Sequence, residues 1–147
     1  MDTDTLTDFL DESIALLAYS GVGVVLMALG VVLVELLTPG NLRKLIWEDR
    51  NRNAALLLAS NLIAVGLVAA MAVYTTEGDA GLAVAVASSF IYGLISLIVM
   101  GVAFVLLDFM TPGKLGELVT RSESHPAVYV SMAMHLAIAL VIVAGLS

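Results

Sequence analysis

The sequence contains no cysteine, and it is poor in charged residues for its length. Only 13% of its 147 residues are charged, 61% are hydrophobic, and the mean hydropathy is +1.05. The absence of cysteine excludes a disulfide framework and any chemistry that needs a thiol. Because a soluble domain has about 25% charged residues, this composition also excludes an ordinary soluble domain.

Catalytic motifs are missing as well. The sequence has no nucleophile paired with a base and an orienting acid, no glycine loop of the phosphate-binding kind, and no metal-ligand cluster; its two histidines, His125 and His135, do not make a metal site by themselves. We therefore expect a protein that is not an enzyme and that needs no cofactor and no metal. The net charge of −7 argues against a nucleic-acid partner.

Long apolar blocks make up most of the chain. Residues 13–34, 54–76, 80–107 and 126–146 contain no Asp, Glu, Lys or Arg. Each block exceeds the roughly 18 residues that mark a transmembrane helix. The sequence predicts an all-α fold, an integral membrane four-helix bundle in the lipid bilayer of the cell membrane. Residues 1–12 form an acidic tail, unlike the basic start of a signal peptide.

The six basic residues fall in two of the loops between blocks. The positive-inside rule places both loops in the cytoplasm, and both termini then lie outside. Four of these residues follow the first block and two follow the third: Arg43, Lys44, Arg50 and Arg52, then Lys114 and Arg121.

An internal repeat relates the two halves. ELLTPGNL begins at Glu35 and DFMTPGKL begins at Asp108, and a shift of 73 residues superimposes them without a gap (108 − 35 = 73). Each half then contains two helices, about 13–76 and about 80–147. An even number of crossings per half predicts parallel repeats related by a pseudo-two-fold axis along the membrane normal.

The repeated Thr-Pro-Gly predicts a corner at the cytoplasmic end of the first helix in each half. Thr and Pro suit the N-cap and first position of a following helix. The segment NLRKLIWED that follows predicts a short amphipathic helix in the interface, with Trp47 near the membrane surface, and KLGELV is its weaker copy. The corner residues are Thr38, Pro39 and Gly40, and Thr111, Pro112 and Gly113.

The repeated motif resembles a known family. An acid, Thr-Pro, a polar segment and an Asn-Ala start to the next helix, here Asn53-Ala54, are similar to the family known as domain of unknown function 350, the UPF0719 type. The resemblance implies a tandem duplication of a two-helix unit over nearly the whole chain after residue 13. Pro126 stands where the second copy would have Asn. The family implies no function.

The two repeated acids have two interpretations. Glu35 and Asp108 lie three residues before their threonines, about 5 Å inside the corner. They can fix the corner by binding the N–H groups of the helix that follows. Alternatively, they form a proton or cation site at the cytoplasmic mouth, since acids inside spanning segments suggest function.

Asn61 and His135 form a second polar level, one position apart in the repeat alignment. Histidine can relay protons. Hydrogen bonds between helices are the simpler explanation for both residues.

Two functions therefore stay open. One is an oligomeric proton or cation channel or transporter that uses Glu35, Asp108, Asn61 and His135. The other is a membrane scaffold whose basic loop binds anionic lipid or a soluble partner through Arg43, Lys44, Trp47, Arg50 and Arg52. The large lipid-facing surface of four such helices favours a homo-oligomer.

Overall fold

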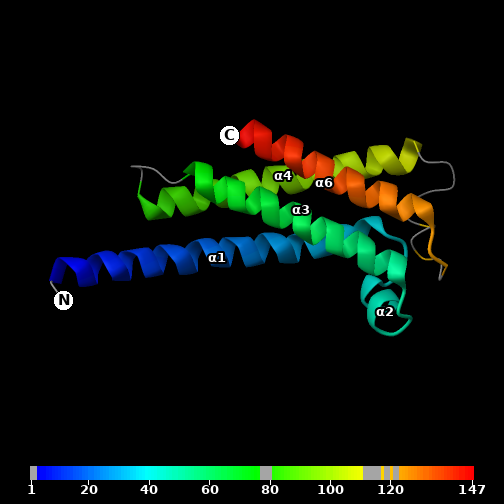
Figure 1. The fold of residues 1–147 in the computed structure, drawn as a ribbon, viewed down its shortest axis with the longest axis horizontal. Helices are drawn as coiled ribbons and strands as arrows, with labels where there is room; N and C mark the ends of the chain where they lie inside the picture. The colour runs from blue at the N-terminus through cyan, green and yellow to red at the C-terminus, as the bar shows by residue number, and fades with distance from the viewer. Residues whose placement is uncertain (1–2, 77–80, 111–116, 118–119, 121–122) are drawn as a thin grey trace.

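The computed structural model describes residues 3–76, 81–110, 117, 120 and 123–147, and contains no strand within them. Its helices follow in the order shown in Figure 1. Four of them are long and apolar enough to cross a membrane, which confirms the predicted all-helical membrane fold. They are α1 (Thr3–Leu37), α3 (Arg52–Thr76), α4 (Leu82–Met110) and α6 (Pro126–Leu146), and the short α2 spans Leu42–Trp47.

The first helix is much longer than a membrane is thick. α1 has 35 residues, about 52 Å at 1.5 Å per residue, against roughly 30 Å of hydrocarbon. The acidic tail expected over residues 1–12 is helical from Thr3 onward. In Figure 1, α1 extends beyond the other helices at its N-terminal end. Its first turns expose apolar side chains, Phe9 to 59% and Leu10 to 50%.

Equivalent helices of the two predicted repeats run in the same direction and pack together. Leu26 of α1 meets Gly93 of α4, and Leu33, two turns on, meets Gly101. Positions increase along both helices, so α1 and α4 are parallel. A Cβ atom on Gly93 would overlap the side chain of Leu26. The missing side chain therefore lets the two helices approach closely, as small residues do between membrane helices.

The helix α3 occupies the centre of the bundle. It packs against α1, α4 and α6, and also against α2. In the described part of the chain, α1 and α6 are the spanning helices that share no such interface. An exact two-fold axis would give α1–α6 the same contact as α4–α3. The bundle departs from that symmetry, since α3 packs against α4 whereas the described residues of α1 and α6 share no such interface.

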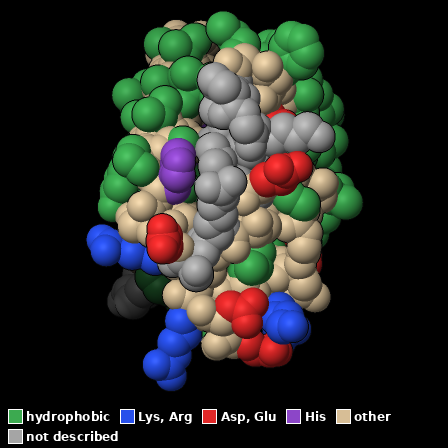
Figure 2. Space-filling model, turned by 90° about the vertical axis from the view of Figure 1, so that its right-hand side faces the viewer, with side chains coloured by type: hydrophobic (Ala, Val, Ile, Leu, Met, Phe, Trp, Pro, Cys, Tyr) green, Lys and Arg blue, Asp and Glu red, His purple; other side chains and the backbone are tan. Residues whose placement is uncertain are grey.

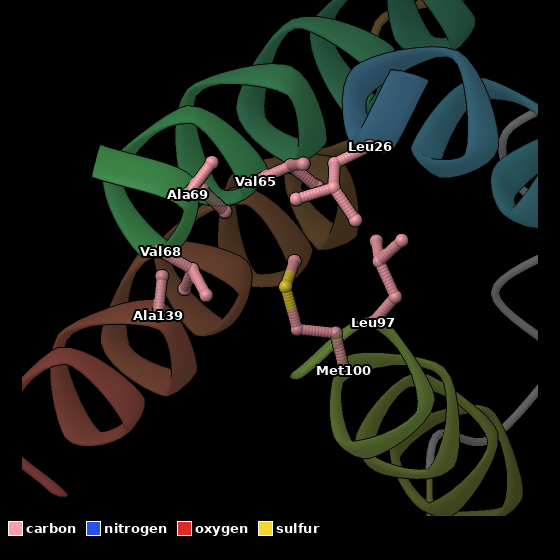
Figure 3. Packing of buried hydrophobic residues seen from close by; sticks show 8 residues of the cluster. Leu26, Val65, Val68, Ala69, Leu97, Met100 and Ala139 are labelled. Atoms are coloured by element: carbon pink, nitrogen blue, oxygen red, sulfur yellow. The ribbon is translucent and has the colours of Figure 1, made fainter. Parts of the chain in front are cut away.

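The core consists of two apolar clusters separated along the bundle axis. We call the end that carries Arg43, Lys44, Arg50 and Arg52 the basic end. The near cluster lies toward it: Val34, Leu42, Ala54, Leu57, Leu58, Phe104 and Val128. The far cluster lies toward the opposite end: Leu26, Ala64, Val65, Val68, Ala69, Leu97, Met100 and Ala139. Figure 3 shows its side chains converging between the helices.

The corner after α1 differs from the expected one. We predicted Thr38 as the N-cap and Pro39 as the first helical residue, and both predictions were wrong. Asn41 is the N-cap, because its side chain accepts a hydrogen bond from the Lys44 N–H at 2.9 Å. Residues 38–40 form the bend, in which Gly40 has a φ of +103° that glycine adopts at little cost.

The predicted second corner, Thr111, Pro112 and Gly113, and the segment KLGELV lie outside the described residues, apart from Glu117. The short helix α2 does form where the first segment predicted it. Leu42 is buried, whereas Arg43, Lys44 and Trp47 are exposed.

Gly93→Ala should destabilise the bundle by about 1–3 kcal/mol, the usual cost of overpacking, because its Cβ would displace Leu26. The measurement is thermal unfolding of the purified protein in detergent. Gly66→Ala is the matched control, since a Cβ there meets nothing within 4 Å. Equal stability of the two variants would contradict the close α1–α4 contact.

Candidate functional site

A buried polar layer lies between the two apolar clusters. The Ser60 hydroxyl on α3 lies 3.0 Å from Nδ1 of His135 on α6 and donates to the Leu57 carbonyl at 2.8 Å. Which of the two atoms donates in the Ser60–His135 bond depends on the tautomer of the histidine ring. Both side chains are buried, His135 to 3% exposure. The bond orients the imidazole ring and engages Nδ1, not Nε2.

Asn61 extends this layer to α1. Its Nδ2 donates to the Gly30 carbonyl at 3.1 Å. A Cβ on Gly30 would lie 3.2 Å from that nitrogen and 3.0 Å from a methyl group of Val65. Gly30 is thus the residue that lets Asn61 reach the backbone of α1. The layer therefore ties α1, α3 and α6 together by interhelical hydrogen bonds, as the simpler interpretation predicted.

A small cavity joins the two polar side chains. Its volume is about 10 Å³, close to the lower limit for one water molecule. The Phe104 ring stacks on His135 with centroids 5.6 Å apart. Among the described residues, Nε2 of His135 and Oδ1 of Asn61 have no hydrogen-bond partner. All four spanning helices line the cavity: Leu33, Val34, Leu37, Asn61, Met100, Gly101, Phe104 and His135.

The two acids occupy matching places outside this cavity. Glu35 lies two residues before the end of α1, and Asp108 lies two residues before the end of α4. Glu35 is exposed, and Asp108 is half-buried. Neither lines the cavity of Asn61 and His135. Thus the structure brings together two of the four predicted site residues and leaves the roles of the two acids as predictions.

Glu35 instead lines a groove between α1, α2 and α3, of about 600 Å³. Of the predicted lipid or partner contacts, Arg43 and Trp47 line this groove, whereas Lys44 and Arg50 are exposed elsewhere, as is Arg52. Figure 2 shows that acidic and basic side chains alternate over this end of the molecule. The complete lining is Val31, Glu35, Leu42, Arg43, Trp47, Leu58 and Leu62.

Two asparagines before and in the first turn of α3 connect the halves. Asn53 donates to the Glu123 carbonyl at 2.7 Å and accepts from the His125 N–H at 3.3 Å. Asn51 donates to the Thr120 carbonyl at 3.2 Å. Both residues are buried. We did not predict these contacts; the only signal was the presence of asparagine beside a helix start.

Helix caps give α3 and α6 the same register. The Asn51 side chain accepts a hydrogen bond from the Ala54 N–H at 3.1 Å and thereby caps α3, and His125 is the N-cap of α6. The two capping residues are 74 positions apart in the sequence (125 − 51 = 74). Asn61 and His135 are also 74 apart (135 − 61 = 74), so each lies ten residues after its capping residue. The buried residues agree: Val128, Ser131, His135 and Ala139 in α6, and Ala54, Leu57, Asn61 and Val65 in α3.

The chain is similar to known membrane proteins over almost its whole length. The family model described as Domain of Unknown Function (DUF350) matches residues 6–146. UPF0719 transmembrane proteins of Mycobacterium bovis and Mycobacterium tuberculosis are each 37% identical over 145 residues, 99% of this chain and 94% of theirs. One of Mycolicibacterium paratuberculosis is 32% identical, over 99% of this chain and 95% of its own. No solved structure matches.

Asn53→Ala should lower stability by about 1–3 kcal/mol in total, because it removes two part-buried hydrogen bonds, each worth about 0.5–1.5 kcal/mol. Hydrogen exchange should also quicken in the first turn of α6. Asn41→Ala is the control, since it removes a cap from a short exposed helix. Unchanged exchange in α6 would show that Asn53 does not hold the two halves together.

Proposed function

The chain belongs to the family described as Domain of Unknown Function (DUF350), and we propose that it is an oligomeric channel or transporter for protons or small cations. The observation that supports this most is the buried layer of Ser60, Asn61 and His135. An ionisable side chain inside a membrane bundle is costly, and such groups are found along ion and proton pathways.

The depth of the layer supports the proposal. His135 lies nine residues after the start of α6, and Asn61 lies nine residues after the start of α3. At 1.5 Å per residue, both are about 14 Å from the ends of their helices, near the middle of a hydrocarbon core of roughly 30 Å. Transporters place their substrate and ion sites at this level.

The chemistry of the layer suits a proton better than a larger ion. One ring nitrogen of His135 is held by Ser60, and the other can take up and release a proton without breaking that bond. The cavity of about 10 Å³ admits at most one water-sized species. We therefore assign His135 as the proton-carrying group and Asn61 as the group that orients the occupant of the cavity.

The far cluster is the closed gate in this proposal. Between the cavity and the end opposite the basic end, the space among Leu26, Val65 and Leu97 is too small for a water molecule. Passage would require α1 and α4 to separate from α3, or a path between subunits. This closed, apolar half is the reason for proposing a gated assembly of several copies.

Glu35 and Asp108 are assigned to the entrance. Both lie in the last turn of a spanning helix at the same end of the bundle. Their negative charges would raise the local concentration of cations at that mouth. The positive-inside rule, applied to the basic residues at this end, predicts that it faces the cytoplasm.

A second function is favoured by one specific observation, the exposure of α2. Trp47 is 68% exposed beside the exposed Arg43 and Lys44. An aromatic ring next to basic groups is typical of a surface that binds anionic lipid or a soluble partner. The alternative is therefore a membrane scaffold that transports nothing.

His135→Gln should abolish proton flux into liposomes that contain the purified protein, because glutamine cannot carry the proton. Stability should fall by only about 0.6 kcal/mol, the average for a hydrogen bond between membrane helices. His125→Asn is the matched control: it alters the other histidine and keeps an N-cap acceptor. If His135→Gln conducts like the wild type, the proposed carrier is wrong.

Neutralising both acids, Glu35→Gln with Asp108→Asn, should reduce cation or proton flux in the same assay while the protein keeps its thermal stability. The effect should shrink as the salt concentration rises, because an electrostatic mouth is screened. A large loss of stability would support the corner-fixing role of the acids. Absence of flux in the wild type itself would favour the scaffold.

A further inference from the structure

The groove between α1, α2 and α3 combines an apolar wall with two opposite charges at one end. Glu35 stands on α1 and Arg43 on α2, and the wall between them is aliphatic, for example Val31 and Leu62. No ion pair joins the two charged side chains, although both line the same groove. Each is exposed. A ligand in the groove would therefore meet one anion and one cation, each available to it.

We call the groove and the next hollow along α1 and α3 together the trough. A second hollow of about 380 Å³ is lined by Gly23 and Met27 on α1 and by Gly66 on α3. Met27 is one turn before Val31, and Gly66 is one turn after Leu62, so the two hollows follow the same faces of the same helices. From Glu35 back to Tyr19, the trough is about 24 Å long, more than half of the hydrocarbon thickness.

We propose that this groove binds one phospholipid whose headgroup carries a phosphate and a primary ammonium. Arg43 would bind the phosphate, and Glu35 would accept hydrogen bonds from the ammonium. The acyl chains would lie along the trough, and Trp47 would stand at the level of the headgroups, where tryptophan is enriched.

Charge complementarity selects this class of lipid. A purely anionic headgroup would satisfy Arg43 but would offer the Glu35 carboxylate no cation. A trimethylammonium headgroup has no N–H, so it cannot donate a hydrogen bond to Glu35. A primary ammonium next to a phosphate fits both charges, and charge-assisted bonds are the stronger kind. The charges lie at one end of the trough only, which is the arrangement of a headgroup and its chains.

The experiment is a competition between lipids for the purified full-length protein. The protein in detergent is given equal amounts of phosphatidylethanolamine, phosphatidylglycerol and phosphatidylcholine with identical acyl chains, and retained lipid is identified by native mass spectrometry. We expect one phosphatidylethanolamine to be retained in preference to the others. Glu35→Gln should lower its preference over phosphatidylcholine about tenfold, and Arg43→Gln should lower retention of all three, as loss of a charged hydrogen bond predicts.

Two variants serve as matched controls. Glu48→Gln and Asp49→Asn remove acidic charges just after α2, but neither residue lines the groove. Both should retain the lipid as the wild type does. Thermal unfolding of every variant separates loss of binding from loss of the fold. Retention is read without an ion gradient, so the result does not depend on whether the protein transports anything.

Three results would overturn the proposal. Equal or better retention of phosphatidylglycerol would mean that Glu35 does not select the headgroup. If the control variants changed lipid retention as much as the Glu35 and Arg43 variants do, the lipid would be held by the overall charge of this end and not by the groove. Efficient disulfide formation between copies carrying Gly66→Cys would mean that a second copy of the chain, and not a lipid, covers the trough.

Discussion

The hydrogen bonds of Ser60, Asn61 and His135 constrain the rest of the bundle, because the middle of a membrane offers no water as a substitute. Asn61 can reach α1 only where Gly30 has no side chain, and His135 can face Ser60 only if α6 lies beside α3. The apolar clusters on either side exclude lipid and water from the layer. An arrangement of the helices that packed well but broke these hydrogen bonds would leave buried polar groups unpaired, which is energetically costly.

The fold was largely predictable from the sequence, because length and hydropathy alone specify a spanning helix. All four predicted spans are present. The corner was predicted in place but not in detail. Thr38 and Asn41 are both good capping residues, and the choice depends on the backbone at Gly40, which a sequence pattern does not reveal. Thr38 is instead buried, with its hydroxyl unpaired in the described structure.

The candidate site was predictable in its parts but not in its grouping. Asn61 and His135 were predicted as one polar level, and they do share a cavity. Ser60 was missed because a serine inside an apolar block is also compatible with simple helix packing. Glu35 was predicted at a shallower level of the same site, but the position along a helix does not specify which side a residue faces, and Glu35 faces the groove beside α2. The alignment of α6 with α3 could be predicted correctly only from the capping residues. The gapless shift of 73 residues pairs His135 with Leu62, whereas aligning the two caps pairs His135 with Asn61.

The length of α1 has a structural consequence. An α-helix is stiff over this distance, and the ten residues from Thr3 to Glu12 continue about 15 Å beyond the apolar block. The other end of the same helix supplies Leu33 and Leu37 to the wall of the central cavity. One continuous helix therefore presents the exposed carboxylates Asp8, Asp11 and Glu12 at one end of the bundle and forms part of the wall around His135 toward the other.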